Sequence, residues 1–176
     1  MLVVSRELAG QIHVFQYLPS LAPSGFLRPD QMRQLELFQR FYLSGQLEHA
    51  AQIASQILKD GWGDPISECL AGYLLLRRGD NASLGVFDQF MMTRPYHNKM
   101  SDSYVLHAEY EARQGDDAQA ESIYRTAINQ GLPIIVDGLR RLADGVQRYH
   151  IQNPSADWIT NVYRNRVGSW LWSAVS

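Results

Sequence analysis

The spacing of apolar residues changes near residue 30, from an alternating pattern to a helical one. Residues 2–4 and 12–17 are rich in β-branched and aromatic side chains, and Ala9-Gly10 lies between them. Two such segments on either side of a glycine turn predict a β-hairpin over residues 1–18. A hairpin alone is marginal in water, so we expect it to pack on the helices or to add to another chain's sheet.

The main part of the chain, residues 30–150, is predicted to be helical because its apolar residues recur at the spacing of one helix face. A linker over residues 19–29, which contains several prolines, precedes it. The apolar segment Leu70–Leu76 predicts a central helix, and a seventh helix is expected over residues 133–150. Glycines divide the first six helices into three antiparallel pairs, with the turns at Gly45, Gly79 and Gly115.

The helix pair over residues 102–133 has the clearest pattern. Gly131 and Pro133 end its second helix, as glycine at a C-cap and a following proline commonly do. The pair resembles a tetratricopeptide repeat, which has large and small residues in its first helix and small, aromatic and small residues in its second. Glu111 replaces the family's tyrosine, and Pro133 comes one place late. The residues that match are Tyr104, Ala108, Ala120, Tyr124 and Ala127.

The three turn glycines lie 34 and 36 residues apart. This spacing is close to the tetratricopeptide period of about 34 residues. One repeat cannot bury its apolar face alone, so neighbouring copies are required. We therefore predict a mainly α fold: a tetratricopeptide-like solenoid of antiparallel helix pairs over residues 30–150, with a short N-terminal β-hairpin.

The C-terminal segment, residues 151–176, predicts a last amphipathic helix with three tryptophans and two arginines. The last repeat of a solenoid exposes an apolar face, which this helix would cap. Tryptophan and arginine are also favoured at protein interfaces, so docking of a partner is a second interpretation. Binding to a membrane surface is a third. The residues concerned are Trp158, Trp170, Trp172, Arg164 and Arg166.

A second resemblance covers more of the chain. The order of short motifs is similar to helical-repeat segments that follow caspase-like or trypsin-like protease domains in bacterial defence and conflict proteins. This resemblance implies a part that senses or docks a partner. Because no protease domain is present in these residues, it also implies that any protease is a separate chain. The motifs lie at 27–30, 64–65, 71–79, 131–133 and 137–139.

Composition excludes several classes of function. A net charge of −2 gives no electrostatic footprint for nucleic acid. The single cysteine, Cys69, excludes an internal disulfide and a cysteine-rich metal site. The first residues lack a secretion signal, and no apolar run reaches the ~20 residues that a membrane-spanning helix needs. We therefore expect a cytoplasmic protein without a membrane span.

Candidate catalytic or metal-binding residues are few. Cys69 lies among leucines, where a free cysteine usually acts as a small buried hydrophobe. His107 has Glu109 and Glu111 nearby in sequence, which we expect to point to other faces. We predict packing or surface roles for the histidines, and neither a metal nor a cofactor. The five histidines are His13, His49, His97, His107 and His150.

These observations favour a non-catalytic adaptor or regulatory subunit that holds another protein, such as a separate protease or effector chain. The tetratricopeptide resemblance implies a concave groove lined by the first helix of each pair. The predicted groove of this chain lacks the lysines and asparagines with which some members of that family bind a terminal carboxylate. A C-terminal peptide ligand is therefore not expected. A chaperone for a secreted effector and a small helical enzyme are the alternatives. The predicted groove residues are Gln39, Tyr42, Tyr73, Arg77, Glu109 and Arg113.

Overall fold

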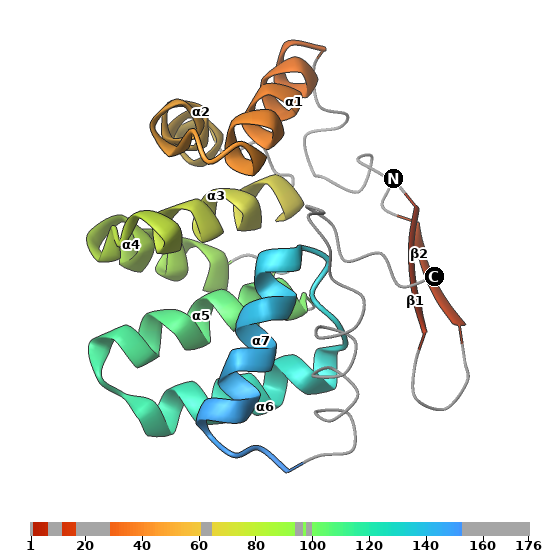
Figure 1. The fold of residues 1–176 in the computed structure, drawn as a ribbon, viewed down its shortest axis with the longest axis vertical. Coiled ribbons are helices and arrows are strands. Elements are labelled where there is room, and N and C mark those ends of the chain that lie inside the picture. Colours follow the sequence, from red (N-terminus) through yellow and green to blue (C-terminus); the bar gives the residue numbers. More distant parts are fainter. Residues whose placement is uncertain are drawn as a thin grey trace. The chain divides into compact units, whose positions relative to one another are not determined.

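Seven α-helices and two β-strands make up the part of the chain that the computed structural model describes (Figure 1). That part is residues 2–6, 12–16, 29–60, 65–93, 97 and 100–152. The fold is mainly helical, as predicted. The helices are α1 (Pro29–Leu43), α2 (Leu47–Asp60), α3 (Pro65–Arg78), α4 (Asn81–Met92), α5 (Ser101–Gln114), α6 (Asp117–Gln130) and α7 (Val136–Arg148).

The two strands are β1 (Leu2–Arg6) and β2 (Ile12–Gln16), which pair antiparallel from Leu2 opposite Gln16 to Arg6 opposite Ile12. The predicted turn at Ala9-Gly10 lies outside the described residues, so the hairpin as a unit stays a prediction. Residues 19–28 of the predicted linker and residues 153–176 of the predicted C-terminal helix also lie outside them.

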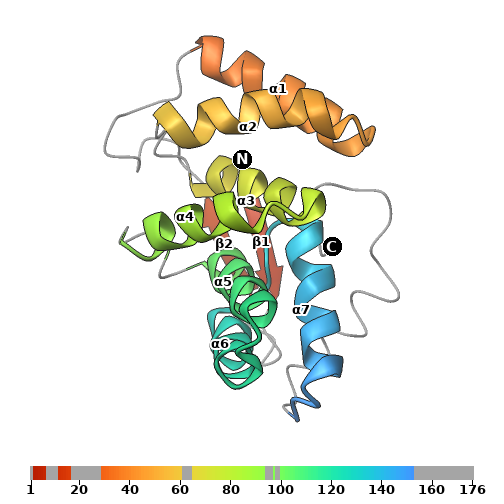
Figure 2. The same cartoon turned by 90° about the vertical axis from the view of Figure 1, so that its left-hand side faces the viewer.

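The chain divides into two units, residues 18–90 and residues 1–17 with 91–176. We call them the central unit and the terminal unit. In the central unit, α1 packs on α2 and α2 packs on α3. In the terminal unit, α5 and α6 form an antiparallel pair, and α7 packs on both of them (Figure 2). As predicted, the apolar helix α3 is central, because its residues from Ile66 to Leu76 are all buried.

The three turn glycines have the same geometry. Their φ angles are 73° at Gly45, 71° at Gly79 and 87° at Gly115, in the left-handed region that glycine enters without steric cost. In each turn the glycine N–H donates to the carbonyl three residues earlier, and the next N–H donates to the carbonyl five residues earlier. This pattern of bonds is the Schellman motif that ends many helices. The repeated spacing in the sequence therefore corresponds to a repeated turn.

A fourth turn of this kind follows α7, although it contains no glycine. His150 has a φ of 49°, its N–H donates to the Gln147 carbonyl, and the Ile151 N–H donates to the Val146 carbonyl. His150 lies 35 residues after Gly115, which continues the spacing of the earlier turns. The sequence prediction stopped at three turns because it counted glycines.

Replacing His150 with glycine should raise the free energy of unfolding by about 0.5–1 kcal/mol. The left-handed conformation costs a residue with a side chain about 1–2 kcal/mol, and the entropy that glycine loses on folding offsets part of this gain. Urea unfolding of the variant and the wild type measures this difference in the free energy of unfolding. Gln147→Gly, inside α7, is the control and should lower stability. A His150→Gly variant less stable than the wild type would contradict the claim that the left-handed conformation at His150 has a cost in free energy.

The second helix of each pair buries the same positions. Counted from the turn glycine, the residues five, nine and twelve places later are all at most 5% exposed. The residue ten places later is exposed in each pair. The buried residues are Ala50, Leu84 and Ala120 five places after the glycine, Ala54, Asp88 and Tyr124 nine places after it, and Ile57, Met91 and Ala127 twelve places after it. The exposed residues ten places after the glycine are Ser55, Gln89 and Arg125.

Asp80 caps the N-terminus of α4 by accepting the Ser83 N–H at 3.0 Å. That hydrogen bond from the Ser83 backbone is the main reason why the pKa of Asp80 lies below its ordinary value. Loss of such a cap costs about 1 kcal/mol, so Asp80→Ala should lower stability by that amount at pH 7.

The pH dependence of this effect has a definite sign. Because the pKa is lower in the folded state, the stabilisation is fully present above the unfolded-state value of 3.8 and is lost as the pH falls through the folded-state value. The gap in unfolding free energy between wild type and Asp80→Ala, measured in urea, should therefore narrow from pH 7 to pH 3. A gap of constant size would contradict the role of the carboxylate.

Candidate functional site

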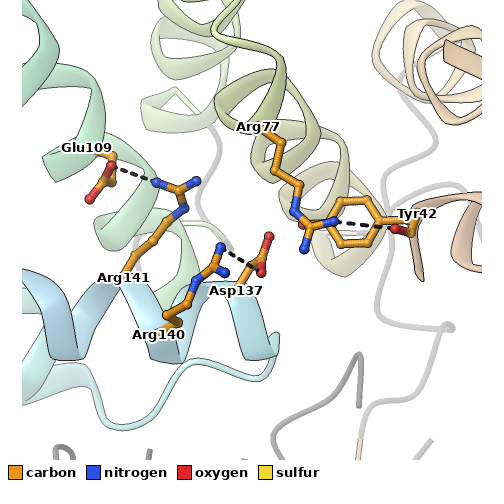
Figure 3. Close-up of polar contacts among 6 residues, drawn as sticks. All are labelled: Tyr42, Arg77, Glu109, Asp137, Arg140 and Arg141. Carbon is orange, nitrogen blue, oxygen red and sulfur yellow. Dashed lines mark hydrogen bonds and ion pairs between the residues drawn. The ribbon is translucent and has the colours of Figure 1, made fainter. Parts of the chain in front are cut away.

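The predicted groove residues of the central unit have unequal exposure. Tyr73 is 0% and Tyr42 only 2% exposed, whereas Arg77 is exposed. The Arg77 guanidinium lies over the Tyr42 ring, with its Cζ 4.3 Å from the ring centroid, and its Nη1 donates to the Tyr42 carbonyl at 3.4 Å (Figure 3). Nothing is described of the Gln39 side chain. The two tyrosines thus pack in the interior, and Arg77 is the exposed residue among these three.

This burial corrects one premise of the sequence prediction. Tyr42 and Tyr73 were predicted to line a groove open to a partner, but both side chains are buried in the chain by itself. They lie on α1 and α3, and their burial means that other atoms of the chain cover them. Contact of these residues with a partner stays a prediction.

In the terminal unit, Glu109 on α5 is 6% exposed and makes two hydrogen bonds to other helices. One carboxylate oxygen accepts a hydrogen bond from the Tyr124 hydroxyl of α6 at 2.5 Å. The other accepts one from Arg141 Nη1 of α7 at 2.8 Å, as Figure 3 shows. We call these three residues the buried polar triad. Because both carboxylate oxygens have partners inside the unit, Glu109 joins α5, α6 and α7, and its place in a partner-binding groove stays a prediction. Arg113, the other predicted groove residue on α5, is half-buried.

The triad sits in tight packing. Burial, together with the negative charge of Glu109, raises the pKa of the Tyr124 hydroxyl, which therefore remains a donor at neutral pH. A Cβ atom on Gly145 of α7 would lie 2.5 Å from the Tyr124 ring. Only glycine leaves room for the ring there. The triad and this contact fix the position of α7 on the α5–α6 pair.

Arg140 and Arg141 are adjacent in sequence but have different partners. Both lie within α7, where Arg140 forms an ion pair with Asp137 at 3.2 Å and Arg141 contacts Glu109. A partner 32 residues away cannot be found from local spacing. The tyrosine at position 124, which the family pattern singled out, was the available signal for this cluster.

Two further contacts set the direction of α7. At its start, Asp102 of α5 accepts the backbone N–H groups of Ile134 and Ile135 at 2.6 and 3.3 Å. At its end, the Tyr149 hydroxyl donates to Asp117 at the start of α6, at 2.7 Å. Since α6 starts directly after the turn that ends α5, α7 begins where α5 begins and ends where α5 ends. The two helices therefore run in the same direction, as successive first helices of a repeat array do.

The candidate catalytic residues are either buried or in contact with neighbouring side chains. Cys69 is a free cysteine and is 0% exposed, so a substrate cannot reach its thiol. His107 lies 3.9 Å from the carboxylate of Glu111, so the expectation that Glu111 points to another face was wrong. Residues four apart share a face of a helix, whereas Glu109, two residues away, points inward. The ring of His49 contacts that of Phe41, with centroids 5.2 Å apart, which is a packing role.

None of the helices that the structure describes is both long enough and apolar enough to cross a lipid bilayer.

Comparison with known proteins places this domain in a family. Residues 39–171 match the family model described as the Y4kD C-terminal domain. The chain belongs to this family. It is also 35% identical over 181 residues to a probable protease from a Desulfuromonadales bacterium. This match covers 99% of the chain but only 22% of the relative's length. Among solved structures, none matches.

The Y4kD match bears on the two resemblances found in the sequence. It includes every described residue from position 39 onward, so the helices α2 to α7 belong to one family domain. The relative's name agrees with the expected association with proteases. The helices fit a helical repeat, whereas membership of the tetratricopeptide family stays a prediction.

Proposed function

We propose that this Y4kD C-terminal domain is a non-catalytic module that binds a protein within a protease-associated assembly. The observation that carries the proposal is its relation to the bacterial probable protease, of which it matches 22%. Most of that protein lies outside the match and has room for a catalytic region. The domain's part would then be to hold a protein partner or substrate for that region.

The use of the polar side chains supports a binding role. Glu109, Arg141 and Asp102 are engaged in contacts that join the helices of the terminal unit. The Cys69 thiol is closed to substrates. Groups that are held in such contacts stabilise the arrangement of the helices and are not presented to a reacting molecule.

The proposed architecture is a solenoid of helix pairs, in which each pair adds its first helix to one surface. Three turns with the same hydrogen bonds and three second helices with the same buried positions support it. On this surface we assign the leading contact in the central unit to Arg77, because Tyr42 holds its guanidinium in place. Arginine stacked on an aromatic ring loses less freedom when it binds, and arginine is common at interface hot spots.

Affinity capture tests this function. The tagged chain should recover a specific protein from its native host, and isothermal titration with the purified partner should confirm a stoichiometric complex. Arg77→Gln should weaken this complex at least about tenfold, which corresponds to ~1.4 kcal/mol. Arg125→Gln is the matched control, because Arg125 pairs only with Glu121 on its own helix among the contacts shown. A purified chain that binds no protein, or that cleaves one by itself, would refute the proposal.

A further inference from the structure

Three helices carry an arginine at the same place in their last turn. Arg77 of α3, Arg113 of α5 and Arg148 of α7 each lie two residues before the turn residue that follows the helix. In α1 this place holds Leu43. A cation in the last turn complements the helix dipole, but this effect does not require one exact position. The recurrence therefore favours a second role for the arginines.

Two of these arginines lie on tyrosine rings. The Arg77 Cζ is 4.3 Å from the centroid of the Tyr42 ring, and the Arg148 Cζ is 5.8 Å from that of the Tyr149 ring. A guanidinium within about 6 Å of a ring centroid is attracted to the ring face. An arginine positioned in this way loses less freedom when it binds a planar anion such as a carboxylate.

Arg148 differs from the other arginines of α6 and α7 in its charge balance. It is exposed, and no carboxylate of the described residues forms an ion pair with it. The other three each have a carboxylate partner. The pairs are Arg125 with Glu121, Arg140 with Asp137 and Arg141 with Glu109.

The nearest turn contains two acidic residues that already have hydrogen-bond donors. Because α5 and α7 run in the same direction, Arg148 lies at the end of the terminal unit where α6 begins. There Asp116 accepts the Gln119 N–H at 3.0 Å, and Asp117 accepts the Tyr149 hydroxyl at 2.7 Å. Both carboxylates thus have partners inside the unit, which leaves Arg148 for an acidic group from outside.

We propose that the protein partner of this domain presents an acidic segment, and that its aspartate or glutamate side chains bind Arg148 at the end of α7. Arg113, at the same end of α5, supplies a second guanidinium for this segment. Charge complementarity identifies the occupant, since an arginine without a carboxylate partner attracts one. Nucleic acid is the less suitable anion for a chain with a net charge of −2. The inference rests on the proposed function and specifies the chemistry of the partner.

Selection of peptides tests this chemistry. The tagged full chain is used to select binders from a phage library of random short peptides, each fused to the coat protein through its C-terminus, so that no terminal carboxylate is free. The selected peptides should contain aspartate and glutamate at least about twice as often as the unselected library. Selection with the Arg148→Gln variant should lose this enrichment.

Fluorescence anisotropy with one selected peptide tests the site. Arg148→Gln should weaken binding at least about fivefold, because a charge-assisted hydrogen bond is lost. Asp144→Asn should strengthen binding, because Asp144 is an exposed negative charge one turn before Arg148 on the same helix face. Arg125→Gln is the matched control and should leave the affinity unchanged. Thermal unfolding of each variant checks that it remains folded.

The outcomes separate this inference from the proposed function. Peptides that bind but are not enriched in acidic residues would refute the acidic segment and leave protein binding intact. An acidic peptide that binds Arg148→Gln as tightly as the wild type would refute the site. If no peptide is selected, the inference fails, and affinity capture from the native host decides the proposed function independently.

Discussion

Replacing Arg141 with methionine is expected to lower the free energy of unfolding by about 3–5 kcal/mol. The Arg141 guanidinium bonds to Glu109 at 2.8 Å, and the Glu109 side chain is 7% exposed. Without Arg141, that carboxylate remains buried with only the Tyr124 hydroxyl as its shown partner. Removing one member of a buried ion pair has a cost of this size because the other charge is left uncompensated. Urea unfolding at pH 7 measures it.

Two further variants test the cause. Arg140→Met removes the neighbouring arginine, whose side chain is 39% exposed, and leaves Asp137 in the first turn of α7, where the helix dipole favours a negative charge. It should therefore destabilise the protein less than Arg141→Met does. Adding Glu109→Gln to Arg141→Met removes the stranded charge and should recover part of the lost stability. If Arg140→Met and Arg141→Met were equally destabilising, the buried polar triad would not hold α7.

Replacing Gly145 with alanine should lower the free energy of unfolding by about 1–2 kcal/mol. The added Cβ would lie 2.5 to 2.8 Å from three carbon atoms of the Tyr124 ring. This ring cannot move aside easily, since Tyr124 is 0% exposed and its hydroxyl is bonded to Glu109. Overpacking of this kind costs about 1–3 kcal/mol, and alanine returns up to about 1 kcal/mol through its higher helix propensity.

The same substitution should change sign when the ring is absent. In a Tyr124→Leu background, Gly145→Ala should be neutral or stabilising, because only the helix-propensity gain remains. Thermal or urea unfolding of the wild type, the two single variants and the double variant gives the interaction free energy between positions 124 and 145. A loss of stability of the same size in both backgrounds would show that the contact with Tyr124 is not the cause.

The turns and the second helices could be predicted from the sequence because their causes are local. Gly45, Gly79 and Gly115 mark left-handed turns, and the spacing of small and apolar residues gives the buried face of the helices. The turn at His150 was missed for the same local reason. Histidine is one of the residue types enriched in this conformation, but it pays a steric cost there that glycine does not, so a histidine alone does not predict such a turn.

The long-range contacts could not be predicted in this way. Glu109 was assigned to a groove because its position in the sequence matches a groove position of the tetratricopeptide repeats that this segment resembles. Its actual surroundings depend on α7, which brings Arg141 to it across 32 residues of chain. Tyr42 and Tyr73 likewise match groove positions, but their burial depends on what packs over α1 and α3. The contact of His107 with Glu111 is different, since the four-residue rule alone would have found it.

The central claim, that this domain binds a protein and leaves catalysis to another region, is tested most directly on the longer bacterial relative. Its kcat/KM should be measured on a short fluorogenic peptide and on its protein substrate, with and without the region that matches this chain. Deleting that region should leave peptide hydrolysis within about threefold of the intact enzyme, while cleavage of the protein substrate falls at least about 30-fold, which corresponds to ~2 kcal/mol of lost binding. Loss of peptide hydrolysis in a deletion protein that remains folded would contradict the claim.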